Sequence, residues 1–143
     1  MLGQGVDFRS LEHPGRSCFA THVLRDRNDA ADELAKKGVL GESQECWQVE
    51  LLQQYCTCPC DYLCLVSFDG GASPNPGPAG CGSCVWLASN RCFREDVQLT
   101  EQSLQWQLLH SSSSHLGLQS NIYAEWHGLL SGLLAVIRIR TVV

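Results

Sequence analysis

The spacing of apolar and charged residues predicts a helix over residues 28–38, NDAADELAKKG. Acids fill its first turns, lysines fill its last turn, and Gly38 stands where such a helix would end. Asn28 is placed to cap the N-terminus. A weaker helical pattern, with Trp47, Leu51 and Leu52 at helical spacing, predicts a second helix over residues 43–54.

A longer apolar pattern begins at Asn121, which is a suitable helix cap. Apolar side chains recur at the spacing of one helix face, at positions 122, 126, 129, 130, 133, 134 and 137. This stripe predicts a helix whose large side chains are buried. We expect Trp126 to pack inside, and the ending IRIRTVV to turn toward a strand pattern.

Short apolar runs predict strands at residues 18–24, 62–68 and 80–89. The run at 62–68 ends at Asp69, and the glycines and prolines that follow predict a turn into the run at 80–89. Residues 92–99 alternate enough for a third strand, so an antiparallel meander is expected. Four serines at 111–114 fall in a predicted polar loop that reaches about residue 120.

Composition narrows the class of protein. With 143 residues, 44% of them hydrophobic, the chain has enough apolar side chains for one ordinary core. No apolar run reaches about 18 residues and no basic-then-apolar N-terminus is present, so neither a membrane span nor a signal peptide is expected. We expect an intracellular protein, cytoplasmic or nuclear. A net charge of −5 argues against a protein that binds nucleic acid through positive charge alone. It still permits a site in which carboxylates bind a divalent metal ion and the ion contacts the phosphates.

Nine cysteines, an odd number without a secretory signal, predict free thiols rather than a disulfide framework. Cys56, Cys58, Cys60 and Cys64 are spaced too tightly for an ordinary zinc knuckle, although a cysteine-cluster metal protein stays an alternative. The CxxC pair Cys81 and Cys84 lies in a predicted strand, which places the two side chains on opposite faces and argues against chelation.

Three segments together resemble the ribonuclease H family. FDGGASPNPGPAGCGSCVWL is similar to the first hairpin of that fold, and HLGLQSNIYAEWHGLLSGL to its first long helix. THVLRDRNDAADELAKKG is similar to the last strand and helix, where a His, an Asn six residues on and an Asp ten residues on share the active-site edge. The resemblance covers about residues 20–38 and 62–143.

The order of these segments departs from the family, because the tail-like segment precedes the head-like one. The resemblance implies an α/β, ribonuclease H-like fold: a three-stranded antiparallel meander plus a long helix, truncated before the fourth strand, after a strand–helix segment. It divides the chain into a tail-like segment (1–45), a cysteine-rich linker (46–61) and the N-terminal part of a ribonuclease H-like domain (62–143). The edge left by a missing strand offers a route to self-association.

The resemblance implies hydrolysis of RNA in RNA–DNA hybrids by two Mg²⁺ ions, with Mn²⁺ as an alternative. The expected catalytic residues are Asp69, Glu125, Asp32 and His22, the first three also as metal ligands. The expected contacts to nucleic acid are Gly70, Gly71, Asn75 and Asn121, since glycines let the backbone approach a sugar–phosphate chain. Because the family's third carboxylate after the long helix is missing, cleavage is expected to be weak or absent.

Each of these residues also has a plainer interpretation. Asp69 and Asn75 suit a turn, Glu125 suits a helix surface, and His22 suits a strand with its ring satisfied. Asp32 in a first turn compensates the helix dipole without any metal. The alternative function is therefore a non-catalytic interaction fragment of a retroelement or of a tandem ribonuclease H protein.

Overall fold

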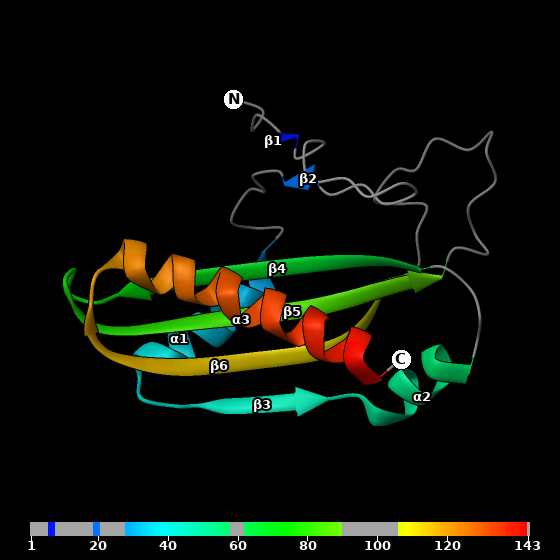
Figure 1. The fold of residues 1–143 in the computed structure, drawn as a ribbon. Helices are drawn as coiled ribbons and strands as arrows, with labels where there is room; N and C mark the ends of the chain where they lie inside the picture. The colour runs from blue at the N-terminus through cyan, green and yellow to red at the C-terminus, as the bar shows by residue number, and fades with distance from the viewer. Residues whose placement is uncertain (1–5, 8–18, 21–27, 58–61, 90–105, 143) are drawn as a thin grey trace.

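The computed structural model describes residues 6–7, 19–20, 28–57, 62–89 and 106–142 (Figure 1). Its centre is a four-stranded antiparallel sheet in the order β3-β6-β5-β4. The strands of this sheet are β3 (Gln44–Trp47), β4 (Tyr62–Ala72), β5 (Gly77–Ser89) and β6 (Gln107–Gln119). A separate antiparallel pair joins β1 (Val6–Asp7) to β2 (Phe19–Ala20).

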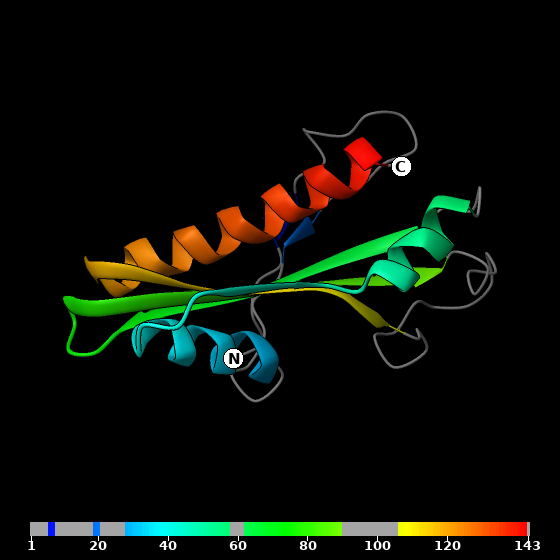
Figure 2. The same cartoon turned by 90° about the horizontal axis from the view of Figure 1, so that it is seen from below.

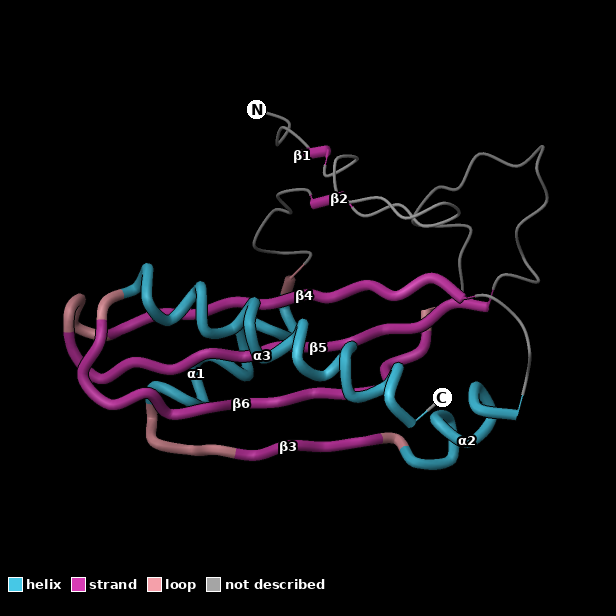
Figure 3. The backbone as a smooth tube through the Cα atoms, in the orientation of Figure 1, coloured by secondary structure: helices cyan, strands magenta, loops and turns pink. Residues whose placement is uncertain are grey.

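Two helices cover opposite faces of the sheet, which makes the fold α/β with three layers (Figure 2). These are α1 (Asp29–Val39) and α3 (Asn121–Val142). A third helix, α2 (Val49–Thr57), follows β3 beyond the end of the sheet (Figure 3). The strands β4, β5 and β6 form a meander, and β3 adds to the outer side of β6, so β4 and β3 are the two edge strands.

Glycines let both helices approach the sheet closely. A Cβ at Gly80 would lie 2.1 Å from the Val39 nitrogen of α1, and one at Gly82 would lie 2.5 Å from the Ala31 oxygen. On the other face, a Cβ at Gly70 would lie 2.2 Å from the carbonyl carbon of Ala124 in α3. The helices are therefore seated on backbone rather than on side chains at these points.

The apolar core lies toward the other end of the sheet. Its buried members come from β5, β6 and α3: Val85, Leu87, Leu109, Ala135 and Ile139. Trp47, Leu51, Leu52, Val66 and Val136 pack around them. The core thus joins the meander to α2, β3 and the second half of α3, and leaves the glycine-rich end for close backbone contact.

The helix predicted at residues 28–38 is confirmed, with two corrections to its ends. It runs to Val39, so Gly38 lies inside it, packed against the Ser114 carbonyl, rather than ending it. The Asn28 side chain makes no capping hydrogen bond. Charge still supports the helix, because Lys36 pairs with Asp32 one turn earlier at 2.9 Å.

One strand prediction and one loop prediction need correction. The strand that was expected to end at Asp69 continues to Ala72, because its pairing with β5 extends to Ala72 and Ala79. The expected serine loop is the middle of β6, where Ser113 is buried and donates to the Leu34 carbonyl at 2.7 Å. Serine is small enough to fit between α1 and the sheet once its hydroxyl has a partner.

Residues 43–54 are not one helix, since β3 precedes α2 there. Residues 46–57 of the predicted cysteine-rich linker belong to these two elements, while 58–61 lie outside the described residues. The third strand predicted at 92–99 also lies outside them, and β6 is the third strand of the meander instead. The predicted strand at 18–24 is described only as β2.

The long helix is confirmed, but the face that it buries against the sheet is opposite to the predicted one. Its small residues Ala124, Gly128, Gly132 and Ala135 face the sheet, and Trp126 is 68% exposed. The ending does not turn into a strand, because α3 continues to Val142. Ser120, not Asn121, caps it, since its hydroxyl accepts from the Tyr123 amide at 3.2 Å. At the N-terminal end of α3, the close approach of Gly70 to the Ala124 backbone leaves no space for a large side chain between helix and sheet.

The segment expected as a tail and the segment expected as a head pack on one sheet, because α1 lies against β4, β5 and β6. The sheet has four strands rather than three, and the fourth, β3, comes from the N-terminal side. Within the described ranges, no helix has the length and apolar character needed to cross a bilayer.

Candidate functional site

The glycine-rich end of β4 is held between the N-termini of two helices. From the α1 side, the side-chain amide of Asn28 donates to the Phe68 backbone carbonyl at 2.8 Å. From the α3 side, the Asn121 side-chain oxygen accepts from the Ala72 amide at 2.7 Å. The backbone amide of Asn121 in turn donates to the Asn75 side-chain oxygen at 3.1 Å. The backbone around Asp69 is therefore fixed from both sides of an edge strand.

Two carboxylates are in contact at this point, and a third, on another element, is near enough for its charge to act on one of them. Asp32 of α1 is in side-chain hydrogen-bond contact with Asp69 of β4, and the charge of Glu125 in α3 acts on the same Asp69 carboxyl. Asp69 points to the same side of the sheet as α1. It pairs with Gly82, and a Cβ built at Gly82 would point at Ala31 of α1, which places Asp69 on the side of Asp32. Glu125 is exposed and lies just after the first turn of α3.

Burial raises the pKa of the Asp69 carboxyl above its ordinary value of 3.8, and contact with Asp32 and the charge of Glu125 raise it further. The Gly70 amide, which donates to Asp69 at 2.9 Å, opposes this by favouring the charged form. Lys36 partly neutralises the pair through its 2.9 Å contact with Asp32, which raises the pKa of Lys36. The three acids Asp69, Asp32 and Glu125 therefore carry more negative charge than Lys36 neutralises.

This raised pKa predicts a dependence of stability on pH. The folded state binds the Asp69 proton more tightly than the unfolded state, so its stabilising contribution is complete below about pH 4 and is lost as pH rises through the raised pKa. In Asp69→Asn this loss is absent. We expect urea unfolding to show that the variant gains stability relative to the wild type as pH rises from about 4 to 7. Parallel pH profiles for the two proteins would contradict the coupling of Asp69 to its neighbours.

The donor set suits a hard cation, which takes oxygen ligands. Besides the carboxylates, the Asn28 side-chain oxygen is buried without a hydrogen-bond partner, and its amide nitrogen lies against the residue before Asp69. However, no three His, Cys, Asp or Glu side chains of the described ranges are spaced around one ion. Of the three acids, only Asp69 and Asp32 are in contact with each other, so a cation at this point would have two carboxylate ligands.

The remaining predicted residues take different positions. The Gly71 α-carbon is open, because a Cβ there would meet nothing nearer than the Asn121 side-chain oxygen at 4.0 Å. Gly70, by contrast, is occupied by the backbone of α3 and faces no ligand. Asn75 and Asn121 bind each other and β4, which accounts for both without a substrate. His22 lies outside the described residues.

The cysteines form no cluster in this part of the chain. Cys46, Cys81 and Cys84 carry free thiols, in line with the prediction of thiols rather than a disulfide framework. Burial raises the pKa values of Cys81 and Cys84, which makes both thiols less reactive. Cys81 approaches His127 of α3 at 3.8 Å, while Cys84 contacts Ser67 of the neighbouring strand. The two CxxC cysteines therefore do not chelate together.

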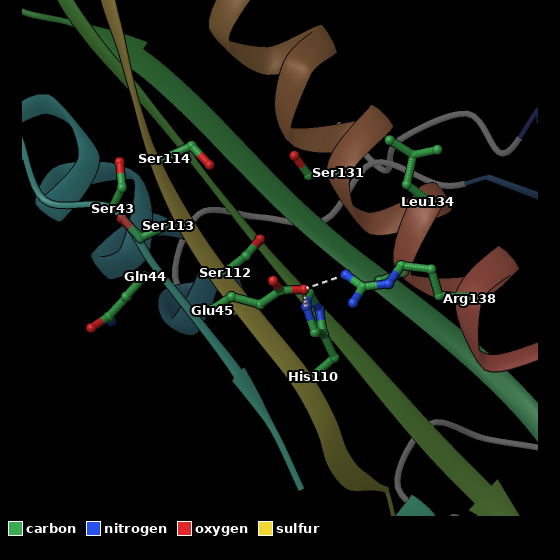
Figure 4. Close-up of a pocket in the computed structure, with 11 residues that line it drawn as sticks. Ser43, Gln44, Glu45, His110, Ser112, Ser113, Ser114, Ser131, Leu134 and Arg138 are labelled. Carbon is green, nitrogen blue, oxygen red and sulfur yellow. Dashed lines mark hydrogen bonds and ion pairs between the residues drawn. The ribbon is translucent and has the colours of Figure 1, made fainter. Parts of the chain in front are cut away.

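A second polar cluster, which the sequence pattern did not predict, lies between β3, β6 and α3 (Figure 4). One oxygen of Glu45 accepts from His110 at 2.9 Å, from Arg138 at 2.7 Å and from Trp47 at 3.0 Å. His110 is only 3% exposed, and the hydrogen bond from it is the main cause of a lowered pKa at Glu45. These residues border a groove of about 440 Å³ that is otherwise lined largely by serines. Their distances in sequence leave no motif that could have revealed them.

Comparison with known proteins adds a limited likeness. No protein-family model matches the chain, and no solved structure matches it. Curated relatives include the bifunctional protein Rv2228c of Mycobacterium tuberculosis (strain H37Rv) and the uncharacterized protein Mb2253c of Mycobacterium bovis. Each is 33% identical over 69 residues, which is 48% of this chain and 15% of the relative. The chain thus matches only a small part of the length of these relatives.

Proposed function

We propose that this protein is ribonuclease H-like and binds nucleic acid, by preference an RNA–DNA hybrid, through a divalent cation held at Asp69 and Asp32. The observation that carries the proposal is the contact between these two carboxyls, with Glu125 acting on the same group. The contact joins residues 37 positions apart in the two segments whose sequences resemble that family. A cation would relieve the uncompensated charge, because it favours the ionised form of every carboxyl around it.

Each residue has a distinct part in this proposal. Asp69 and Asp32 would bind the ion, and the unpartnered Asn28 oxygen would accept from one of its waters. When bound, Mg²⁺ or Mn²⁺ polarises a phosphoryl oxygen and lowers the pKa of a coordinated water. The open position at Gly71 leaves space for a sugar–phosphate chain beside the acids.

Cleavage is expected to be weak. A two-metal reaction needs oxygen ligands for both ions, and Mg²⁺ demands near-octahedral geometry. In the described part of the chain no three acidic or other ligating side chains surround one point. One ion has two ligands, and a second ion has too few.

The test is a titration of the protein with Mg²⁺ and with Mn²⁺, followed by thermal unfolding. A ligand that binds the folded state at 100 times its Kd adds about 2.7 kcal/mol to the free energy of unfolding. We expect a stabilisation of this order in the wild type and its loss in Asp69→Asn and Asp32→Asn. Asp29→Asn is the matched control, because it removes the same charge from an exposed position of the same helix.

Nucleic-acid binding is then measured by the fluorescence anisotropy of a labelled RNA–DNA hybrid, with and without Mg²⁺. We expect binding that requires the ion and that Asp69→Asn abolishes. Equal stabilisation of wild type and Asp69→Asn by the ion would overturn the metal site. Stabilisation without hybrid binding would overturn the nucleic-acid partner alone, and would favour the second candidate below.

The second candidate is a non-catalytic interaction protein. It is favoured by the exposed apolar side chains of α3, which a nuclease site does not need. The self-association expected through a sheet edge would use β4 or β3, and it stays a prediction.

A further inference from the structure

The face of α3 that points away from the sheet is apolar and exposed. Its large side chains are about half or more accessible: Ile122, Tyr123, Trp126, Leu130, Leu133, Leu134 and Ile137. The opposite face carries the small buried residues Ala124, Gly128 and Ala135. The helix thus has two apolar faces, one packed on the sheet and one exposed, with polar residues such as Glu125 and Arg138 between them, and an exposed apolar face of this size is typical of a binding surface. Figure 2 shows α3 as the outermost layer on its side of the sheet.

The spacing of these residues indicates that the partner is a helix. Tyr123, Trp126, Leu130, Leu133 and Ile137 form what we call the α3 seam, with successive intervals of three, four, three and four residues. This is the a/d repeat of helices that pack side by side, in which each side chain enters a hole on the facing helix.

The seam is complementary to itself when two copies run antiparallel. With a two-fold axis between Leu130 and Leu133, each of these leucines faces the other residue of the pair in the second copy. Trp126 then faces Ile137 in the same register, so large and medium side chains alternate along the contact. Ile122 and Trp126 are each 68% exposed and the other large side chains of this face are 46–56% exposed, so the face offers an extended apolar area to a partner, of which a stable interface uses about 800 Å² per side.

We propose that the protein forms a two-fold dimer in which the α3 seam packs antiparallel against the same seam of a second copy. Glu125 lies beside the seam rather than in it, so the metal site stays accessible in the dimer. This inference does not rest on the proposed function, and a failure of metal binding leaves it unaffected.

The experiment measures molecular mass by sedimentation velocity over a range of protein concentrations, using the full chain. We expect a concentration-dependent dimer for the wild type. The double variant Leu130→Lys with Leu133→Lys sets like charges against each other in the dimer, and we expect it to be monomeric. The double variant Leu130→Lys with Leu133→Glu places Lys opposite Glu at both symmetry-related positions, and we expect dimers to return.

The matched control is Leu40→Lys, which changes an equally apolar side chain that is 80% exposed outside the seam, and it should remain dimeric. Circular dichroism confirms that each variant is folded, since all the substituted side chains are exposed. A wild type that is monomeric at all concentrations, or a Lys–Lys variant that still dimerises, overturns the proposal. So does binding of the monomer to anionic lipid vesicles through the seam, which would assign the face to a membrane surface.

Discussion

Gly70→Ala is expected to destabilise the protein by about 3 kcal/mol or more, because overpacking against a backbone cannot be relieved by a side-chain rotation. The added methyl would lie 2.2 Å from the Ala124 carbonyl carbon and 2.5 Å from the Glu125 nitrogen. Either β4, which carries Asp69, or the start of α3, which leads into Glu125, must move. Urea unfolding measures the loss, and we expect metal-dependent stabilisation to disappear with it.

The adjacent glycine provides the control. A Cβ at Gly71 meets only the Asn121 side-chain oxygen at 4.0 Å, and its φ angle is not positive. Gly71→Ala should therefore be neutral or stabilise by about 0.4–1 kcal/mol, because alanine restricts the unfolded chain. If Gly70→Ala were as well tolerated as Gly71→Ala, the close seating of α3 on β4 would be wrong.

Glu45→Ala is expected to cost about 1–3 kcal/mol, because it removes an acceptor shared by three donors and leaves a buried imidazole unpaired. Glu45 joins β3 to β6 through His110 and to α3 through Arg138. The lowered pKa of Glu45 means that its contribution is present above pH 4.5 and is lost as pH falls through the lowered value. The cost should therefore be largest near neutral pH and shrink in acid.

Urea unfolding at neutral and acid pH measures this cost, and amide hydrogen exchange locates it. We expect exchange to increase first in β3, the edge strand that pairs with β6 over four residues. Glu42→Ala removes an exposed acid just before β3 and should change stability by less than about 0.5 kcal/mol. A cost at Glu45 no greater than at Glu42 would show that the cluster adds no stability.

Much of the candidate site followed from sequence. Asp32, Asp69 and Glu125 each stand in a segment whose local pattern is specific, and the helices at 29–39 and 121–142 have clear periods. The hairpin of β4 and β5 was also predicted, because a turn rich in Gly and Pro separates two apolar runs. These features depend on near neighbours along the chain, which a sequence displays directly.

Features set by distant contacts were decided only by the tertiary structure. The four serines form a strand because β5 pairs with all of them and β3 pairs with residues 111–113 on the other side, although serine itself favours turns. Asn28 resembles a helix cap, yet it binds the Phe68 carbonyl 40 residues away. The outward direction of the α3 seam has the same origin, since β4 leaves no space for a side chain at Gly128, which lies against backbone, or at Gly132, which lies against the Val66 side chain. Local pattern determined which residues are helical or acidic, and packing between remote segments determined which way they face, because close contact between backbones excludes every larger side chain.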